Sequence, residues 1–318
     1  MTTYSDYRKS AVMRQLREAI VVNDADTACV MMAELVGAGQ FVDAWQLVIS
    51  VAATHVHITS PLVFIYLNVR LDAFRREVRE SLGPHPLIVL REDAGIRDMF
   101  SEMAYVLCAA PKALTSLTGL MVTIPESDLQ VHMIAARLKA PHADFTTHTF
   151  VTHADAEELA IACNELAYSL HARDGAFASY WVQWIHLRTH MGDHEGKRLA
   201  AAERKLGIEH FETGMRTDTV WIVWDILLQA LSQHTPGAQN QLRPVMLALV
   251  QLYAFKLTRA MQPKKIELIF MAIQLLTVPF RSFFPFPPLI PSAAQHATVL
   301  AHSDDLYNDM ILKYQLAT

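Results

Sequence analysis

Residues 241–278 read QLRPVMLALVQLYAFKLTRAMQPKKIELIFMAIQLLTV and decide the fold class. The stretch holds two long apolar runs, about 241–261 and 264–278, with a proline between them. Each run is longer than an ordinary strand and is apolar on nearly every face. We therefore expect two helices that lie in the middle of a domain or in an interface.

Neither run predicts a membrane span. Gln251, Glu267 and Gln274 interrupt the apolar residues, so no run reaches the ~18 uninterrupted apolar residues that a span requires. The first ten residues, MTTYSDYRKS, are polar and do not resemble a signal peptide. We expect a soluble intracellular protein, in the cytoplasm or nucleus, with no membrane partner.

The rest of the chain extends the helical pattern. Only 11 glycines and 14 prolines occur in 318 residues, and 52% of the residues are hydrophobic. An all-β fold needs more turn residues than this, whereas long helices need few. The sequence predicts an all-α fold of helical hairpins packed as an orthogonal bundle. No fixed-period repeat is evident, so a superhelical repeat protein stays an open alternative.

Helix ends are predicted from capping residues. Caps are expected at Asp24, at Ser60 before Pro61, at Asp155, at Thr217-Asp218 and at Ser303 with the two aspartates after it. Further helices are expected over the ranges 112–124, 126–139 and 194–206. Gly192 is expected to end the helix that precedes the last of these ranges. The apolar run 87–90 fits either a short strand or a helix.

A stretch rich in Thr and His, residues 140–154, shows no apolar period. We interpret it as the linker between two domains, residues 1–139 and 155–318. Trp181, Trp184, Trp221 and Trp224 pair at helical spacing, and we expect them to fill the core of the second domain.

The charge balance does not indicate a general nucleic-acid-binding protein. The chain has 27 Lys and Arg against 32 Asp and Glu, a net charge of −5. Such binding proteins usually carry an excess of basic residues. The candidate nucleic-acid contact is a local basic patch on one helix: Arg70, Arg75, Arg76 and Arg79. Glu77 and Glu80 lie beside it, so a solvated helix face is the alternative.

The histidines raise the question of a metal site. His186, His190 and His194 are spaced four residues apart, which places imidazoles on one face of a continuous helix. A zinc-dependent enzyme built on His186 and His190 is therefore an alternative hypothesis, although the HExxH order of metalloproteases is absent. Five other histidines, at positions 55, 57, 142, 148 and 153, are candidates for a second cluster. Our leading expectation is a chain that binds no metal and no other cofactor.

Other catalytic signatures are missing from the sequence. It holds no GxSxG, no GxxxxGK[ST] and no GxGxxG, and its three cysteines form no CxxC. The paired carboxylates fit the first turns of helices, where they complement the helix dipole. We predict that the chain is not an enzyme. On its proline-rich segment, Phe283, Phe284 and Phe286 are candidates for docking into a groove of the same chain or of a partner.

Residues about 7–120 carry a resemblance to a known family. The stretch begins YRKSAVMRQLREAI (7–20) and VVNDADTACVMMAELVGAG (21–39), continues with DAWQLVISVAATHVHITSP (43–61) and ends with SEMAYVLCAAPKA (101–113). This order resembles the C-terminal helical region of the RarA/MgsA/WRNIP-type AAA+ ATPases, which is related to the clamp-loader collar. The Ala-Pro-Lys segment of that family corresponds to positions 110–112.

The sequence departs from the family at several positions. Thr54 and His55 replace paired acidic residues, with an apparent one-residue insertion. Ala113-Leu114 replaces Ser-Asn, Tyr105 is displaced by one position, and no ATPase domain precedes the region. In the family this region forms a tetramer, and the proteins act at stalled replication forks and on single-stranded DNA. The resemblance implies a collar-like scaffold linked to DNA replication or repair, and a free-standing collar would suit the genome of a large DNA virus.

The leading hypothesis is thus a non-enzymatic helical scaffold that forms a homo-oligomer or binds a protein partner, with nucleic acid as a further candidate partner. The metal-dependent enzyme is the second hypothesis. A virion or other structural component, in which the apolar composition serves packing into an assembly, is the third.

Overall fold

The computed structural model describes residues 3, 5–80, 86–146, 154–208, 211–212 and 214–317. The fold is all-α, as the sequence predicted, and no β-strand occurs within these ranges. The chain folds into two compact units: unit 1 is residues 1–114 with 286–318, and unit 2 is residues 115–285. The C-terminal segment therefore returns to the first unit.

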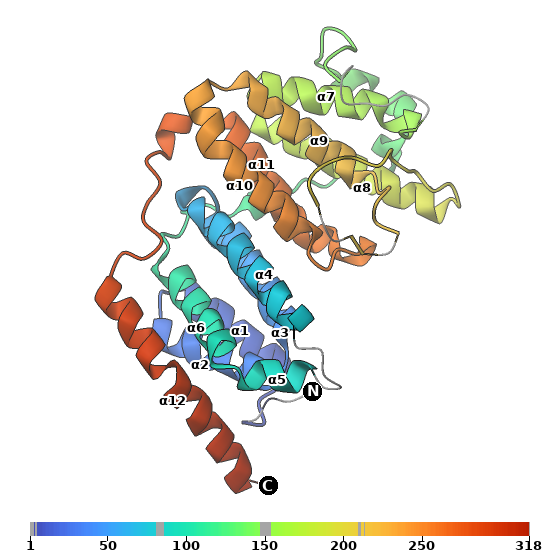
Figure 1. Cartoon of the computed structure of the whole chain (residues 1–318). Coiled ribbons are helices and arrows are strands. Elements are labelled where there is room, and N and C mark those ends of the chain that lie inside the picture. The colour runs from blue at the N-terminus through green and yellow to red at the C-terminus, as the bar shows by residue number, and fades with distance from the viewer. Residues whose placement is uncertain are drawn as a thin grey trace. The chain divides into compact units, whose positions relative to one another are not determined.

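Unit 1 is built from helices whose apolar stripes meet in one core. In Figure 1, α1, α2 and α6 lie close together, with α12 running beside α6. Its helices are α1 (Lys9–Val21), α2 (Ala25–Gly37), α3 (Phe41–Val51), α4 (Leu62–Glu80), α5 (Pro86–Glu92), α6 (Ala94–Ala109) and α12 (Ala293–Ala317).

An aromatic cluster fills the centre of unit 1. The rings of Phe41, Trp45, Phe74 and Phe100 come from α3, α4 and α6 and lie 5.6–5.9 Å apart between centroids. Phe41, Trp45 and Phe100 are at most 1% exposed. Such large side chains contribute most of the apolar area that a domain removes from water.

The stretch Phe41–Thr59 is long and apolar enough for a membrane helix, with 19 residues and a mean hydropathy of 1.2. However, 67% of its most apolar window is buried inside the protein, which is the pattern of a core helix. After α3 the backbone forms a π-helical turn, Ala52–Val56, which is wider than an α-helical turn. This turn contains Thr54 and His55, where the sequence departs from the collar pattern.

Within the described ranges, unit 2 consists of five α-helices that follow a stretch of 3-10 turns. Its helices are α7 (Ala160–His171), α8 (Gly175–His194), α9 (Val220–Ala230), α10 (Pro236–Ala254) and α11 (Ile266–Thr277). Trp181, Trp184, Trp221 and Trp224 are all at most 1% exposed, so the predicted tryptophan core is confirmed. The apolar helices expected near 241–261 and 264–278 are also confirmed as α10, which begins and ends earlier in the chain than expected, and α11, which is shorter at both ends.

The division into units differs from the predicted one. The segment expected to be a linker, 140–154, belongs to unit 2, and its described residues 140–146 are bound to α7. Asn164 and Glu165 of α7 hydrogen-bond the backbone of this segment. Composition alone suggested a linker because the segment lacks an apolar period, yet polar groups of a neighbouring helix hold it.

Three expected helices do not form as α-helix. Residues 112–139 contain only 3-10 turns, at Leu117–Leu120, Glu126–Leu129 and Val131–Arg137, and residues 195–206 are irregular. The ambiguous run near 87–90 is helical, within α5.

Gly192 lies inside α8 rather than ending it. A Cβ at this position would lie 2.7 Å from the carbonyl oxygen of Lys197, so the glycine permits a close approach of the returning chain.

Capping was predicted correctly where the partner is local. Asp24 accepts a hydrogen bond from the Thr27 amide at 3.1 Å, and Asp218 accepts one from the Val220 amide at 3.1 Å. Ser60 was wrong as a cap, because its buried hydroxyl has no hydrogen-bond partner among the described residues. Ser303 was also wrong, since it lies in the middle of α12.

Asp155 is the third incorrect cap, and its true role is tertiary. Its carboxylate accepts hydrogen bonds from Arg204 at 2.7 and 2.6 Å and from the Ala202 amide at 2.8 Å. The α7 helix begins later, at Ala160. The buried carboxylate thus binds a bidentate arginine and a backbone amide instead of capping α7.

Candidate functional site

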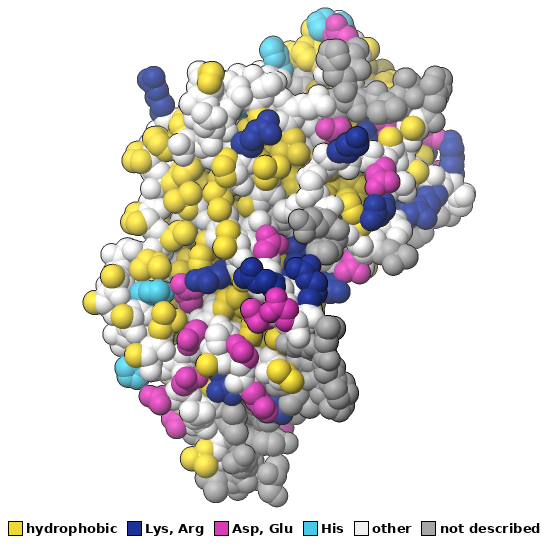
Figure 2. All heavy atoms as spheres, in the orientation of Figure 1, with side chains coloured by type: hydrophobic (Ala, Val, Ile, Leu, Met, Phe, Trp, Pro, Cys, Tyr) yellow, Lys and Arg dark blue, Asp and Glu magenta, His cyan; other side chains and the backbone are white. Residues whose placement is uncertain are grey.

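The four predicted arginines of α4 differ in their surroundings. Arg70 forms an ion pair with Glu102 of α6, and Arg75 lies 3.2 Å from the carboxylate of Asp72. Arg76 and Arg79 are exposed in the last turns of the helix. Figure 2 shows basic and acidic side chains close together on this part of the surface. At least two of the four guanidinium groups are thus engaged by carboxylates of the same chain.

Glu102 is the centre of a buried polar node that the sequence analysis did not find. Its carboxylate accepts hydrogen bonds from Arg70, from the Tyr66 hydroxyl at 3.0 Å and from His296 at 3.1 Å. Burial and the neighbouring Glu102 raise the pKa of Tyr66 far above its ordinary value. The node joins side chains of α4, α6 and α12 in one hydrogen-bond network.

The paired histidines of α8 do come together. The rings of His186 and His190 lie 4.6 Å apart at an interplanar angle of 80°. Burial, followed by the charge of His190, lowers the pKa of His186 to about 4, so its ring is neutral at neutral pH. A neutral imidazole is the form that binds metals. No group of three His, Cys, Asp or Glu that could hold a metal ion occurs among the described residues, and the side chain of His194 lies outside them.

The other histidines have separate environments. His55 and His57 belong to unit 1, and burial lowers the pKa of His55. His142 belongs to unit 2, where it pairs with Asp144 and stacks on Phe145 with centroids 4.7 Å apart. The two remaining candidates, His148 and His153, lie outside the described residues.

The phenylalanines of the proline-rich segment pack partly on their own chain. Phe283 and Phe284 both contact Phe280, with ring centroids 5.6 and 4.8 Å apart. Phe284 is nevertheless 42% exposed. Phe286 is partly exposed and belongs to unit 1. The predicted docking group is therefore divided between the two units.

One surface feature of unit 2 is a hollow between α7 and residues 138–146. Two polar residues of α7 position this segment through its backbone. Glu165 accepts hydrogen bonds from the amides of Lys139 at 2.9 Å and Ala140 at 3.0 Å. Asn164 accepts one from the Phe145 amide at 3.0 Å and donates one to the His142 carbonyl at 2.9 Å. Because these contacts are to backbone atoms, the side chains of the segment remain available to line the surface.

The hollow that results has a volume of about 670 Å³. Leu138 and Ile161 line it and are 41% and 43% exposed. Alanines 140, 143 and 160 add further apolar surface, and His142 and Glu157 supply a polar margin. The arrangement is suited to binding an apolar side chain.

Comparisons of the chain with protein-family models, with curated proteins and with solved structures found no match. The geometry of the described residues and the sequence resemblance therefore carry the functional argument.

Sequence reasoning missed the residues that build the hollow. Asn164 and Glu165 are consecutive polar residues within an apolar helical stretch, IACNELAYSL, and both are at most 6% exposed. Polar residues at a buried helix position usually have a backbone or side-chain partner. Their position in the helix was the available signal, but it does not name the partner.

Proposed function

We propose that this chain is a non-enzymatic helical scaffold that associates with protein, and that the hollow beside α7 is one of its contact surfaces. The observation that carries the proposal is the pair Leu138 and Ile161, which face solvent in a molecule that buries most of its large apolar side chains in two cores. Exposed apolar side chains that line a hollow with a polar margin are typical of interaction sites.

The free energy available from covering Leu138 and Ile161 fits a protein–protein contact. Each of the two side chains is already about half buried, so covering the remainder would contribute about 1 kcal/mol apiece. An anchor residue from a partner would add its own burial in the hollow. Together these terms support a modest, specific association.

The first test changes the hollow and a matched surface position. Ile161→Asp places a charge in the hollow, whereas Leu247→Asp places one on α10 at a side chain that is similarly exposed, 40% against 43%. Light scattering coupled to chromatography, over a concentration series, should show association in the wild type. Ile161→Asp should weaken it at least tenfold, because an apolar contact must then desolvate a carboxylate, and Leu247→Asp should not.

A strict monomer at all concentrations, together with no cross-linked partner in the source cells, would contradict the proposal. Equal weakening by the two variants would remove the hollow as the contact surface while leaving association itself in place.

The collar-like role in DNA replication or repair is the finer part of the proposal, and the sequence resemblance supports it. Its candidate contacts are Arg76 and Arg79, which are exposed at the end of α4. Anisotropy of a labelled single-stranded DNA should report binding that weakens with salt, and the salt dependence should be smaller for Arg76→Glu with Arg79→Glu. Arg243→Glu, at an exposed position on α10, is the control.

One observation favours a second candidate function. The contact between His186 and His190 keeps open a metal-dependent activity, since a neutral imidazole pair can bind a divalent transition ion. Metal analysis of the purified chain, followed by titration with zinc or cobalt, tests this function. Absence of stoichiometric metal, with no uptake that His186→Gln removes, would exclude it.

A further inference from the structure

The C-terminal helix α12 belongs to unit 1, although the helix that precedes it, α11, belongs to unit 2. Residues 278–292 connect the two helices, and they hold five prolines and no α-helix. A proline-rich chain of about 15 residues extends roughly 3 Å per residue, so it can span about 45 Å. The connector therefore permits α12 to bind at some distance from α11.

Part of the contact between α12 and α6 is polar, beside the buried side chains of Tyr307 and Met310. The hydroxyls of Ser101 and Ser303 lie 3.0 Å apart, and His296 lies 3.1 Å from the carboxylate of Glu102. Tyr105 donates a hydrogen bond to the backbone carbonyl at position 292, at 3.2 Å. Release of α12 would expose Tyr307 and Met310, which are 0% and 6% exposed, as well as these polar groups, so the released helix needs an equivalent seat to bind.

The same contact is also specific. Arg97 of α6 pairs with Asp304 at 3.8 Å, and its guanidinium lies 5.2 Å from the centroid of the Tyr307 ring. Tyr307 and Ser303 are both fully buried. The seat on α6 is therefore complementary to α12 in charge, in hydrogen bonding and in shape, and it would select this helix over an unrelated one.

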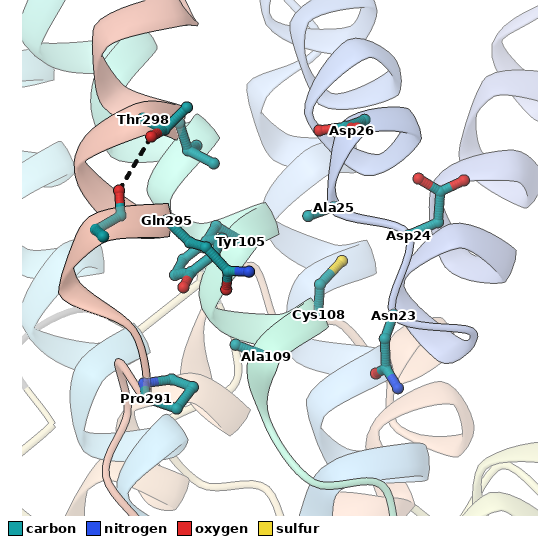
Figure 3. Close-up of a pocket in the computed structure, with 12 residues that line it drawn as sticks. Asn23, Asp24, Ala25, Asp26, Tyr105, Cys108, Ala109, Pro291, Gln295 and Thr298 are labelled. Atoms are coloured by element: carbon teal, nitrogen blue, oxygen red, sulfur yellow. Dashed lines mark hydrogen bonds between the residues drawn. The ribbon is translucent and has the colours of Figure 1, made fainter.

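Packing beneath the first turns of α12 is incomplete. A hollow of about 700 Å³ lies between these turns, the end of α6 and the start of α2. In Figure 3, Gln295 and Thr298 of α12 are on one side of this space, and Asp24 and Asp26 are on the other. The later turns of α12 extend beyond the other helices of unit 1 (Figure 1). Much of α12 is thus in contact with solvent.

We propose that α12 exchanges between copies of this chain, so that α12 of one copy occupies the α6 seat of a second copy. Only the α6 seat, on the same copy or on another, restores both the buried side chains and the polar contacts of α12, and the long proline-rich connector lets the helix reach another molecule. Exchange of an identical element is a low-cost route to a dimer, since every contact in the exchanged form already exists in the single chain. The inference rests on the proposed function only in that both require association between copies or partners.

The test uses the closeness of Ser101 and Ser303. Two differently tagged chains are co-expressed, one with Ser101→Cys and the other with Ser303→Cys. Cys29 and Cys108 are changed to alanine in both, because Cys29 hydrogen-bonds the Ser101 carbonyl and Cys108 lines the hollow. After mild oxidation, exchange predicts a disulfide-linked heterodimer on a non-reducing gel.

The matched control replaces Ser303→Cys by Val69→Cys, an exposed position on α4 outside the seat, 59% exposed. This pair measures random collision and should give at least fivefold less heterodimer. If the heterodimer does not exceed this control while a single chain with both Ser101→Cys and Ser303→Cys cross-links internally, exchange is excluded. Association that persists by light scattering in that case would leave the proposed function standing.

A second variant covers the case in which the cysteine chains do not fold. Ser303→Arg places a large charge at a fully buried position of the seat, whereas Asp305→Arg places it at an exposed position two residues along. Exchange predicts that Ser303→Arg lowers the dimer fraction at least fivefold and that Asp305→Arg leaves it unchanged. A dimer fraction that is the same in both variants contradicts the proposal.

Discussion

Two lysines, one in each unit, hold the end of a long helix by the same set of contacts. Lys112 donates hydrogen bonds to the carbonyls of Leu107, Cys108 and Ala110 at 2.8, 3.0 and 2.8 Å. These are the last carbonyls of α6, which a helix leaves without internal partners. A cation at this end also complements the helix dipole.

In unit 2, Lys265 binds the end of α10 in the same way. It donates hydrogen bonds to the carbonyls of Leu252, Tyr253 and Phe255, the first two at 3.1 and 3.0 Å. In each unit the three acceptors follow one spacing along the chain, with the third at the residue that ends the helix. The two solutions are therefore geometrically equivalent.

The difference lies in how each lysine reaches its helix. Lys112 follows α6 directly, after one proline, and is partly open to solvent. Lys265 lies at the end of the loop that follows α10, directly before α11, and is 5% exposed. Local sequence provides the first cap, whereas the second exists only when α10 and α11 have packed. Removing the Lys265 cap should therefore lower the free energy of unfolding more than removing the Lys112 cap.

The largest effect is expected for Lys265→Met. Methionine keeps the apolar stem but leaves three buried carbonyls without their donor, which should lower the free energy of unfolding by about 3 kcal/mol. Hydrogen exchange measured by mass spectrometry should show faster exchange in peptides covering the end of α10, with α6 unaffected. Unchanged exchange at α10 would mean that the contact contributes little.

Lys112→Met should have a smaller effect, about 1–2 kcal/mol, because water can replace the lysine at a partly exposed helix end. Faster exchange should appear in peptides covering the end of α6 and not in those of α10. If the two methionine variants are equally destabilised, the degree of burial does not control the strength of these caps.

A smaller change tests a fourth acceptor of the first lysine. The Asn23 side chain accepts a hydrogen bond from Lys112 at 2.7 Å, and its backbone has a positive φ of 63° that glycine also adopts readily. Asn23→Gly should therefore cost about 0.5 kcal/mol, mostly from the lost acceptor. Urea denaturation of this variant in the wild-type and Lys112→Met backgrounds should show that the cost depends on the lysine.

The pH dependence of stability should separate the caps further. Burial lowers the pKa of Lys112 from its ordinary 10.5 to about 8. Between these values the unfolded chain binds more protons at this position than the folded chain, so the free energy of unfolding rises with pH across the window. Relative to Lys112→Met, the wild type should gain stability from pH 8 to pH 10. A difference that stays constant with pH would contradict the lowered pKa.

The sequence predicted the contacts that form over a few residues. Asp24 caps α2 and Asp218 meets the start of α9 because donor and acceptor are neighbours along the chain. The all-α class and the tryptophan core followed from periodicity and from the length of the apolar runs. These features depend on local geometry and on burial, which an amino-acid sequence expresses directly.

The candidate site was less predictable. Asp155 and Ser303 were predicted as caps, yet Arg204 and Ser101 are their partners at distances of 49 and 202 residues along the chain. The hollow at Leu138 and Ile161 depends on α7 binding a segment that its composition predicted to be a linker. For Asp155 and Ser303, the prediction assigned a neighbouring backbone amide as the hydrogen-bond partner. A sequence shows which residues are neighbours along the chain, but not which distant residues meet in the fold.

By itself, then, the sequence determined that this chain is helical, which tryptophans fill the core of unit 2 and that Asp24 caps α2. The tertiary structure decided that residues 286–318 join the first unit, that α10 is capped by a lysine from a later loop, and which polar groups stay paired in the interior. The physical reason is range: secondary structure and burial follow from neighbouring residues, whereas buried polar groups find partners only after distant segments have packed.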